Sequence, residues 1–147
     1  MIFNNKYSIF FFIFIALVLG GLSSSDAAND IWYQDLNKSN LNPPGFVFGI
    51  VWPILYILMS ISAFRTFDIT RNLFLFQLFF NALWSWLFFG FNMPVIALVN
   101  IWFLIILNII LFIKMFRIDR LSGILLLPYV IWLIFASYLN LYIVINN

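Results

Sequence analysis

The side chains that usually carry out acid–base, nucleophilic or metal chemistry are scarce in this sequence. It contains no His and no Cys, and its five acidic residues are all Asp. A thiolate or imidazole metal site, a disulfide framework and Cys- or Ser–His-dependent catalysis are therefore excluded. We expect no metal site and no required cofactor, and an enzyme that relies on protein groups alone is disfavoured.

Aromatic and amide side chains are the remaining candidates for recognising a ligand. Gln77, Asn81 and Ser85 recur at every fourth position, so a helix presents them as one polar stripe, with Trp84 beside it. Two other helical faces combine aromatic with small or amide residues, namely Gly49, Trp52 and Tyr56 on one and Tyr129, Trp132, Ala136 and Asn140 on the other.

These faces have two interpretations. Uncharged amides at membrane depth usually bond to other helices, and we expect this role for Gln77, Asn81, Asn100 and Asn108. Tryptophans often form an interfacial belt. However, three of them lie inside helices on the polar faces, Trp52, Trp84 and Trp132. A pocket walled by indoles and phenols, with a few amides, suits a planar and mostly apolar molecule.

Transmembrane helices are the elements that must position these faces. Hydrophobic residues make up 65% of the 147 residues and charged residues 8%, too few to cover a soluble domain. Apolar stretches span residues 8–22, 46–64, 73–91, 95–113 and 122–145. The last four can each cross a hydrocarbon core of about 30 Å. The predicted fold is an all-α membrane protein, a five-transmembrane-helix bundle forming one integral membrane domain over residues 1–147.

The first apolar stretch is the shortest and has an alternative interpretation. It follows Lys6 and is succeeded by small residues, so it also resembles a secretory signal peptide cut after Ala27. We predict a retained helix, which the family resemblance below favours.

Basic residues predict the orientation of the bundle. With five helices, six of the seven Lys and Arg residues fall on one side, namely Lys6, Arg65, Arg71, Lys114, Arg117 and Arg120. The positive-inside rule then places the N-terminus in the cytoplasm, and the C-terminus and the loop of residues 23–45 outside. The net charge of +2 offers no footprint for nucleic acid.

Four blocks of sequence carry a family resemblance. They are residues 32–38 (WYQDLNK), 42–52 (NPPGFVFGIVW), 81–90 (NALWSWLFFG) and 127–140 (LPYVIWLIFASYLN). In this order and spacing they resemble the tryptophan-rich sensory protein / translocator protein family (TspO/MBR). The resemblance implies five transmembrane helices, often in a homodimer, and a ligand pocket that opens toward the long first loop. Members bind porphyrins such as protoporphyrin IX, sterols in some lineages, and benzodiazepine-type ligands.

The resemblance also implies site residues. Trp52 and Trp132 match the pocket tryptophans linked to light-dependent porphyrin breakdown in bacterial relatives. The other matched pocket positions are Tyr33, Pro43, Tyr56, Asn81, Trp84, Ser85 and Ala136.

The chain departs from the family pattern at a few positions. Ser39 replaces the Pro that usually follows Lys in the first loop, and we expect this change to loosen the loop. The proposed cholesterol motif around Leu139 and Tyr142 is incomplete because no Lys or Arg follows it. Gly45-x-x-x-Gly49 permits close approach between helices.

Three functions are therefore compatible with the sequence. The leading hypothesis is a membrane receptor or carrier that senses, sequesters or transports tetrapyrroles. The second is light-driven degradation of a bound porphyrin, which needs no general acid or base. The third is a structural membrane protein that regulates a partner.

Overall fold

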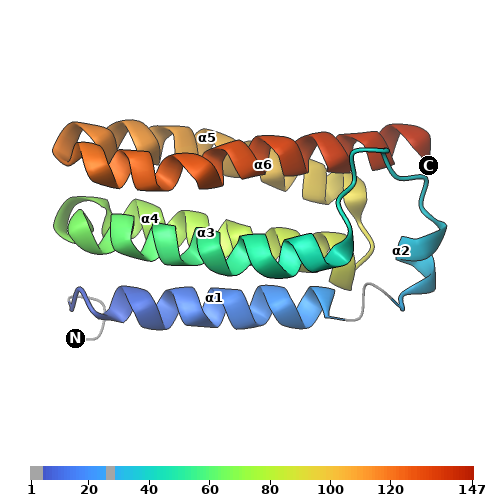
Figure 1. The fold of residues 1–147 in the computed structure, drawn as a ribbon, viewed down its shortest axis with the longest axis horizontal. Helices are drawn as coiled ribbons and strands as arrows, with labels where there is room; N and C mark the ends of the chain where they lie inside the picture. The colour runs from blue at the N-terminus through green and yellow to red at the C-terminus, as the bar shows by residue number, and fades with distance from the viewer. Residues whose placement is uncertain (1–4, 26–28) are drawn as a thin grey trace.

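The computed structural model describes residues 5–25 and 29–147, and all regular structure within these ranges is helical. The long helices run along the long axis of the molecule (Figure 1). They are α1 (Ser8–Ser24), α3 (Gly45–Arg65), α4 (Phe67–Ser85), α5 (Pro94–Ile118) and α6 (Arg120–Asn146). A π-helix, η2 (Trp86–Gly90), continues α4. The short helix α2 (Ile31–Asp35) lies at the end of the bundle that also holds the C-terminus.

The prediction of an all-α membrane protein is confirmed at this level. Four helical segments are long and apolar enough to cross a membrane, namely α3, α4 with η2, α5 and α6. The apolar helix α1 has 17 residues and is shorter than these four. The cleavage position considered after Ala27 lies outside the described residues.

The long helices form a closed ring around the interior. α1 packs on α3 and on α4, α4 packs on α5, α5 packs on α6, and α6 returns to α3. Helices α3 and α4 touch less because α1 covers the groove between them. Side chains from α1, α3, α4 and α6 can therefore meet inside the bundle.

Two predicted boundaries are wrong. The predicted apolar stretches of residues 46–64 and 73–91 leave residues 65–72 between them, but α4 already begins at Phe67. The hydroxyl of Thr66 donates to Ser62 O at 3.0 Å and bonds the Thr70 hydroxyl at 2.9 Å, so this tight link satisfies its own polar groups. Asp68 also suits the first turn of a helix, where the backbone dipole favours negative charge.

The predicted loop of residues 23–45 is also partly helical. Asp30 begins α2, because its carboxylate accepts the backbone N–H of Trp32 at 2.9 Å. We refer to residues 29–44 as the lid, and to the opposite end of the bundle, with the α3–α4 and α5–α6 links, as the link end.

Large apolar side chains fill the interior toward the link end. Several are almost fully buried, including Ile9, Met59, Phe74, Leu111, Met115 and Leu126. Gly123 marks the closest crossing, because a Cβ placed there would lie 2.6 Å from Phe116 Cβ. This half of the bundle has the dense packing of an ordinary protein core.

Amides fasten the helices, as predicted for all four named, and the bonds of Asn81 are described with the cavity below. Asn100 Nδ2 donates to Phe80 O at 3.0 Å, which joins α5 to α4. Asn108 Nδ2 donates to Gln77 Oε1 at 3.2 Å and joins the same pair of helices closer to the link end. These bonds form where water is scarce and alternative partners are few.

Candidate functional site

A cavity of about 790 Å³ lies among α1, α3, α4 and α6 at the lid end of the bundle. Its volume is within the range of about 300–1,000 Å³ that is usual for small-molecule sites. Its walls come from helices that are distant in sequence: Leu17, Gly20, Gly21, Ser24 and Ser25 on α1; Gly45, Phe48, Gly49, Trp52, Pro53 and Tyr56 on α3; Asn81, Trp84, Ser85 and Phe89 on α4 and η2; and Trp132 and Ala136 on α6. The lid adds Tyr33, Asn42, Pro43 and Pro44.

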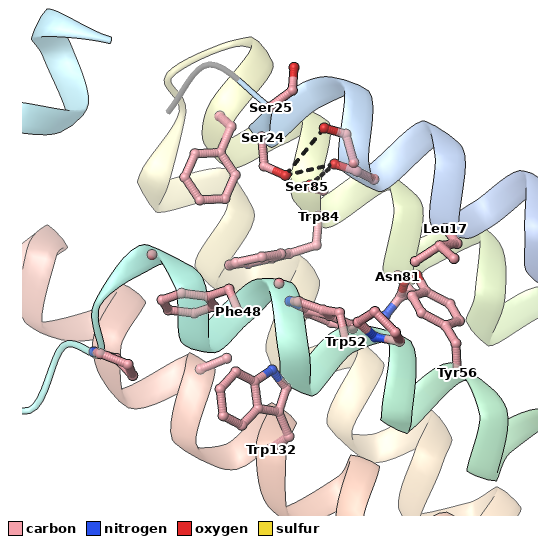
Figure 2. Close-up of a pocket in the computed structure, with 18 of the residues that line it drawn as sticks. Leu17, Ser24, Ser25, Phe48, Trp52, Tyr56, Asn81, Trp84, Ser85 and Trp132 are labelled. Atoms are coloured by element: carbon pink, nitrogen blue, oxygen red, sulfur yellow. Dashed lines mark hydrogen bonds between the residues drawn. The ribbon is translucent and has the colours of Figure 1, made fainter. Parts of the chain in front are cut away.

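One face of α3 forms the aromatic wall of the cavity. Gly45, Gly49, Trp52 and Tyr56 follow one another by four, three and four residues, so they share a helical face. Trp52 contacts Trp132 of α6 edge to face, with ring centroids 6.5 Å apart and planes at 83°. Figure 2 shows the Trp132 ring beneath Trp52, with its indole nitrogen turned toward that residue.

The π-helix shapes the opposite wall. Within it, Phe89 lines the cavity, while its neighbour Phe88 is buried against Trp84 and the lid. Trp84 stacks on Phe88 with ring centroids 5.5 Å apart and an angle of 22°. Single turns of π-helix occur often at functional sites because they redirect side chains in this way.

Polar side chains form the floor of the cavity. The Tyr56 hydroxyl donates to Asn81 Oδ1 at 2.5 Å, and Asn81 Nδ2 donates to the Tyr129 hydroxyl at 2.6 Å. The Tyr129 hydroxyl in turn donates to Gln77 Oε1 at 3.2 Å. This network ties α3, α4 and α6 together and fixes the Tyr56 ring, which is 5% exposed.

Hydroxyl groups hold α1 against α4 on the lid side of the cavity. Ser23 Oγ and Ser85 Oγ are 2.6 Å apart, and Ser85 Oγ also donates to Gly20 O at 3.1 Å. Ser85 therefore both fastens α1 to α4 and lines the cavity.

The lid is fastened at several points. Ser39 Oγ bonds the Tyr138 hydroxyl of α6 at 3.0 Å and accepts the N–H of Leu41 at 3.1 Å. The backbone N–H of Asn37 donates to Asn147 Oδ1 at 2.8 Å. The hydroxyl of Ser39 supplies a bond that a proline could not make, which opposes the loosening expected from the sequence.

Lys38 and Tyr33 stabilise the lid from within. The Lys38 ammonium donates to the backbone oxygens of Tyr33, Gln34 and Leu36 at 2.5–3.1 Å, where it caps the end of α2. The Tyr33 ring lies against Phe89, with centroids 5.4 Å apart. Burial raises the pKa of the Tyr33 phenol, and a hydrogen bond with Asn42 opposes this rise.

The cavity can bind by contact and hydrogen bonding rather than by charge. No charged side chain is found among its lining residues in the described part of the chain. Within the same described residues, the buried indole N–H groups of Trp84 and Trp132 have no hydrogen-bond partner. An aromatic, uncharged wall of this kind favours stacking on a flat apolar body.

All nine residues predicted as pocket positions line this one cavity: Tyr33, Pro43, Trp52, Tyr56, Asn81, Trp84, Ser85, Trp132 and Ala136. The analysis of the sequence missed the contribution of α1 and of the glycines. Gly45-x-x-x-Gly49 was interpreted as permitting close approach of helices, but a Cβ at either position would meet no atom within 4 Å. Within this chain the two glycines border open space.

Comparison with known proteins identifies the family. The sequence model of the TspO/MBR family matches residues 8–145. The chain belongs to the TspO/MBR family. Its similarity to the tryptophan-rich protein TspO of Archaeoglobus fulgidus is 35% identity over 144 residues, covering 92% of this chain and 94% of that protein.

Other family members show similar agreement. The tryptophan-rich sensory protein of Cereibacter sphaeroides is 36% identical over 119 residues, which cover 76% of this chain and 73% of that protein. The human translocator protein is 29% identical over 119 residues, covering 74% of this chain and 70% of its own. The matched region of residues 8–145 includes every helix that lines the cavity.

Proposed function

We propose that this TspO/MBR protein is a membrane receptor or carrier that binds a tetrapyrrole such as protoporphyrin IX in its aromatic cavity. The bound molecule would be sensed, sequestered or transported. The observation that carries the proposal is the convergence of three indoles, from Trp52, Trp84 and Trp132, on one uncharged cavity of about 790 Å³. The names of the relatives, sensory protein and translocator, agree with such a role.

The chemistry of the walls fits this ligand class. A porphyrin ring is flat and apolar, and edge-to-face aromatic pairs such as Trp52 and Trp132 offer it broad contact. Its polar edge needs a few hydrogen-bonding groups, and those on the lid side of the cavity are Ser24, Ser25, Tyr33 and Asn42. The carboxylates of the ligand would therefore face the lid, and its ring the indoles.

The test is quenching of the intrinsic tryptophan fluorescence by protoporphyrin IX, with purified protein kept in the dark. Saturable quenching that is lost in the Trp52→Phe/Trp132→Phe double variant would support the proposal. A Trp102→Phe variant is the matched control, because Trp102 is 48% exposed on α5 and does not line the cavity. Quenching that never saturates would refute tetrapyrrole binding and favour a bundle that regulates a partner.

A second function, light-dependent porphyrin degradation, is favoured by the contact between Trp52 and Trp132. Both indoles line the cavity, so either could exchange an electron with an excited ligand. Illumination after binding tests this function. Loss of porphyrin absorbance in the native protein, and its absence in variants that still bind, would support it.

We also propose that α1 crosses the membrane with the four longer helices, as a fifth transmembrane helix. Its length of 17 residues, most of them apolar, and its packing on α3 and α4 support this arrangement. The N-terminus would then be cytoplasmic and the C-terminus outside, because the basic residues gather at the link end. A homodimer in the bilayer is part of the same proposal, and cross-linking in native membranes tests it.

A further inference from the structure

Side chains of α1 and α3 contact each other toward the link end of the bundle. Toward the link end, the rings of Tyr7 and Phe10 both lie 5.5 Å from the ring of Phe64. Ile9 and Ile13 of α1 are buried in the same core cluster as Met59 of α3. In this half of the bundle, side chains close the space between the two helices.

Toward the lid end, the same two helices line the cavity with glycines. Gly21 on α1 and Gly45 and Gly49 on α3 line the cavity and are exposed. A Cβ at any of the three would meet no atom within 4 Å. The cavity therefore reaches the surface of the bundle between α1 and α3, with no side chain from these positions across the gap.

The gap does not arise because α1 is loosely attached. The other side of α1 is held to α4 by the Ser23–Ser85 bond of 2.6 Å and by the bond from Ser85 to Gly20 O. Helix α1 is thus held on α4, while Gly21 on its cavity side borders open space.

The rim of the gap is apolar. Each of the three glycines is next to a large exposed apolar residue: Leu22 at 61%, Phe46 at 69% and Ile50 at 55% exposure. Such a rim suits contact with lipid acyl chains and not with water. The route at the end of the bundle is covered instead by the lid, which is tied to α6 through Ser39 and Tyr138 and to Asn147.

From these observations we infer that the ligand enters and leaves the cavity sideways, between α1 and α3, from the hydrocarbon region of the bilayer rather than past the lid. This inference rests on the proposed function, because it supposes that a ligand occupies the cavity. It specifies the ligand as one that dissolves in the membrane before it binds.

The opening itself can be tested without any ligand. The chain has no Cys, so Gly21→Cys provides a single site for a nitroxide spin label in lipid vesicles. We expect the label at residue 21 to collide with dissolved oxygen more than with a water-soluble nickel chelate, as a label on the exposed α5 residue Ile106 should. Collision behaviour like that of a label at Asn40 in the lid would overturn the inference.

The direction of ligand movement requires a rate measurement. Leu22→Cys, on the rim of the gap and not among the residues that line the cavity, is alkylated with a bulky maleimide. Protoporphyrin IX is then supplied from donor vesicles while tryptophan fluorescence is followed. We expect association and dissociation both to slow about tenfold with Kd unchanged, because a barrier on the route affects both directions equally. Alkylated Ile106→Cys is the matched control and should bind at the native rates.

A cross-linked lid completes the experiment. A disulfide in Asn37→Cys/Asn147→Cys holds the lid on the C-terminal end of α6, and the sideways route predicts unchanged rates. Slower binding with the lid locked, or unchanged rates with the Leu22 adduct, would overturn the inference. If the unmodified protein shows no saturable quenching, the proposed function fails, whereas the spin-label result still decides whether the cavity opens to lipid.

Discussion

The two ends of this bundle use glycine in opposite ways. At the link end, Gly123 lets α5 and α6 cross so closely that a Cβ would lie within 2.6 Å of Phe116. At the lid end, a Cβ on Gly21, Gly45 or Gly49 would meet nothing within 4 Å. The same residue type thus permits close helix packing in one half and leaves space unfilled in the other.

The two ends also differ in how some of their polar groups are bonded. At the link end, Ser62 Oγ donates to Ser122 O at 2.6 Å, and Arg65 pairs with Asp119 at 2.6 Å. At the lid end, the indole N–H groups of Trp84 and Trp132 are buried without a partner among the described residues. The link end therefore has the dense packing and cross-helix bonds of a protein core, whereas the lid end holds the cavity.

The largest effect on stability is expected from filling the tight crossing. Gly123→Leu would push its side chain into Phe116, whose Cα also lies within 2.8 Å, so backbone must move. Such overpacking costs about 1–3 kcal/mol or more. Thermal unfolding in detergent should show a lower midpoint than that of the native protein. A native midpoint would contradict the contrast between the two ends.

Filling the open end should instead affect binding. Gly49→Leu has room for its side chain and places it on the helical face of Trp52 and Tyr56, inside the cavity. We expect protoporphyrin IX to bind about tenfold more weakly, which corresponds to about 1.4 kcal/mol, with the unfolding midpoint unchanged. Titration of tryptophan quenching measures the affinity, and Ile50→Leu on the exposed side of α3 is the matched control. Undiminished affinity would show that the ligand does not use this space.

A smaller loss of stability is expected from the polar floor that separates the two halves. Asn81→Leu removes the acceptor of the Tyr56 hydroxyl and a donor to the Tyr129 hydroxyl. Hydrogen bonds between membrane helices contribute about 1 kcal/mol, so the unfolding midpoint should fall moderately. Asn146→Leu, which loses only a bond to Tyr142 O in its own helix, should have little effect. Equal midpoints for the two variants would mean that the floor network contributes no net stability.

The smallest effect is expected from the exposed ion pair of the link end. The guanidinium of Arg65, and then the hydroxyl of Ser122, lower the pKa of Asp119 below its ordinary value. The carboxylate therefore adds stability at neutral pH, and this contribution disappears as the pH falls below about 4 and the group takes up a proton. Asp119→Asn should lower the midpoint slightly at pH 7 and not at acidic pH, because solvent screens exposed pairs. A difference that persists unchanged in acid would rule out the ionised carboxylate as its cause.

The sequence predicted the residues of the site better than the shape of the site. Trp52, Tyr56 and Trp132 were identified because helical periodicity places polar and aromatic residues on common faces, and all three line the cavity. The start of α4 was missed because the apolar run begins only at residue 73, whereas Thr66 makes a one-residue link through its own hydroxyl. The helix α2 was missed because its capping by Asp30 and Lys38 lies in a segment without apolar periodicity.

The sequence by itself determined that lipid surrounds the bundle, that the chain is helical, and which kinds of side chain are available. Long apolar runs can satisfy their backbone in lipid only as helices, and a chain without His, Cys or Glu must recognise a ligand by stacking and hydrogen bonding. Only the tertiary structure decided that α1 leans on α4, that Gly45 and Gly49 border open space, and that Gly123 does not. The reason is physical: periodicity fixes the direction of a side chain on its own helix, whereas empty space depends on how far away the neighbouring helix lies.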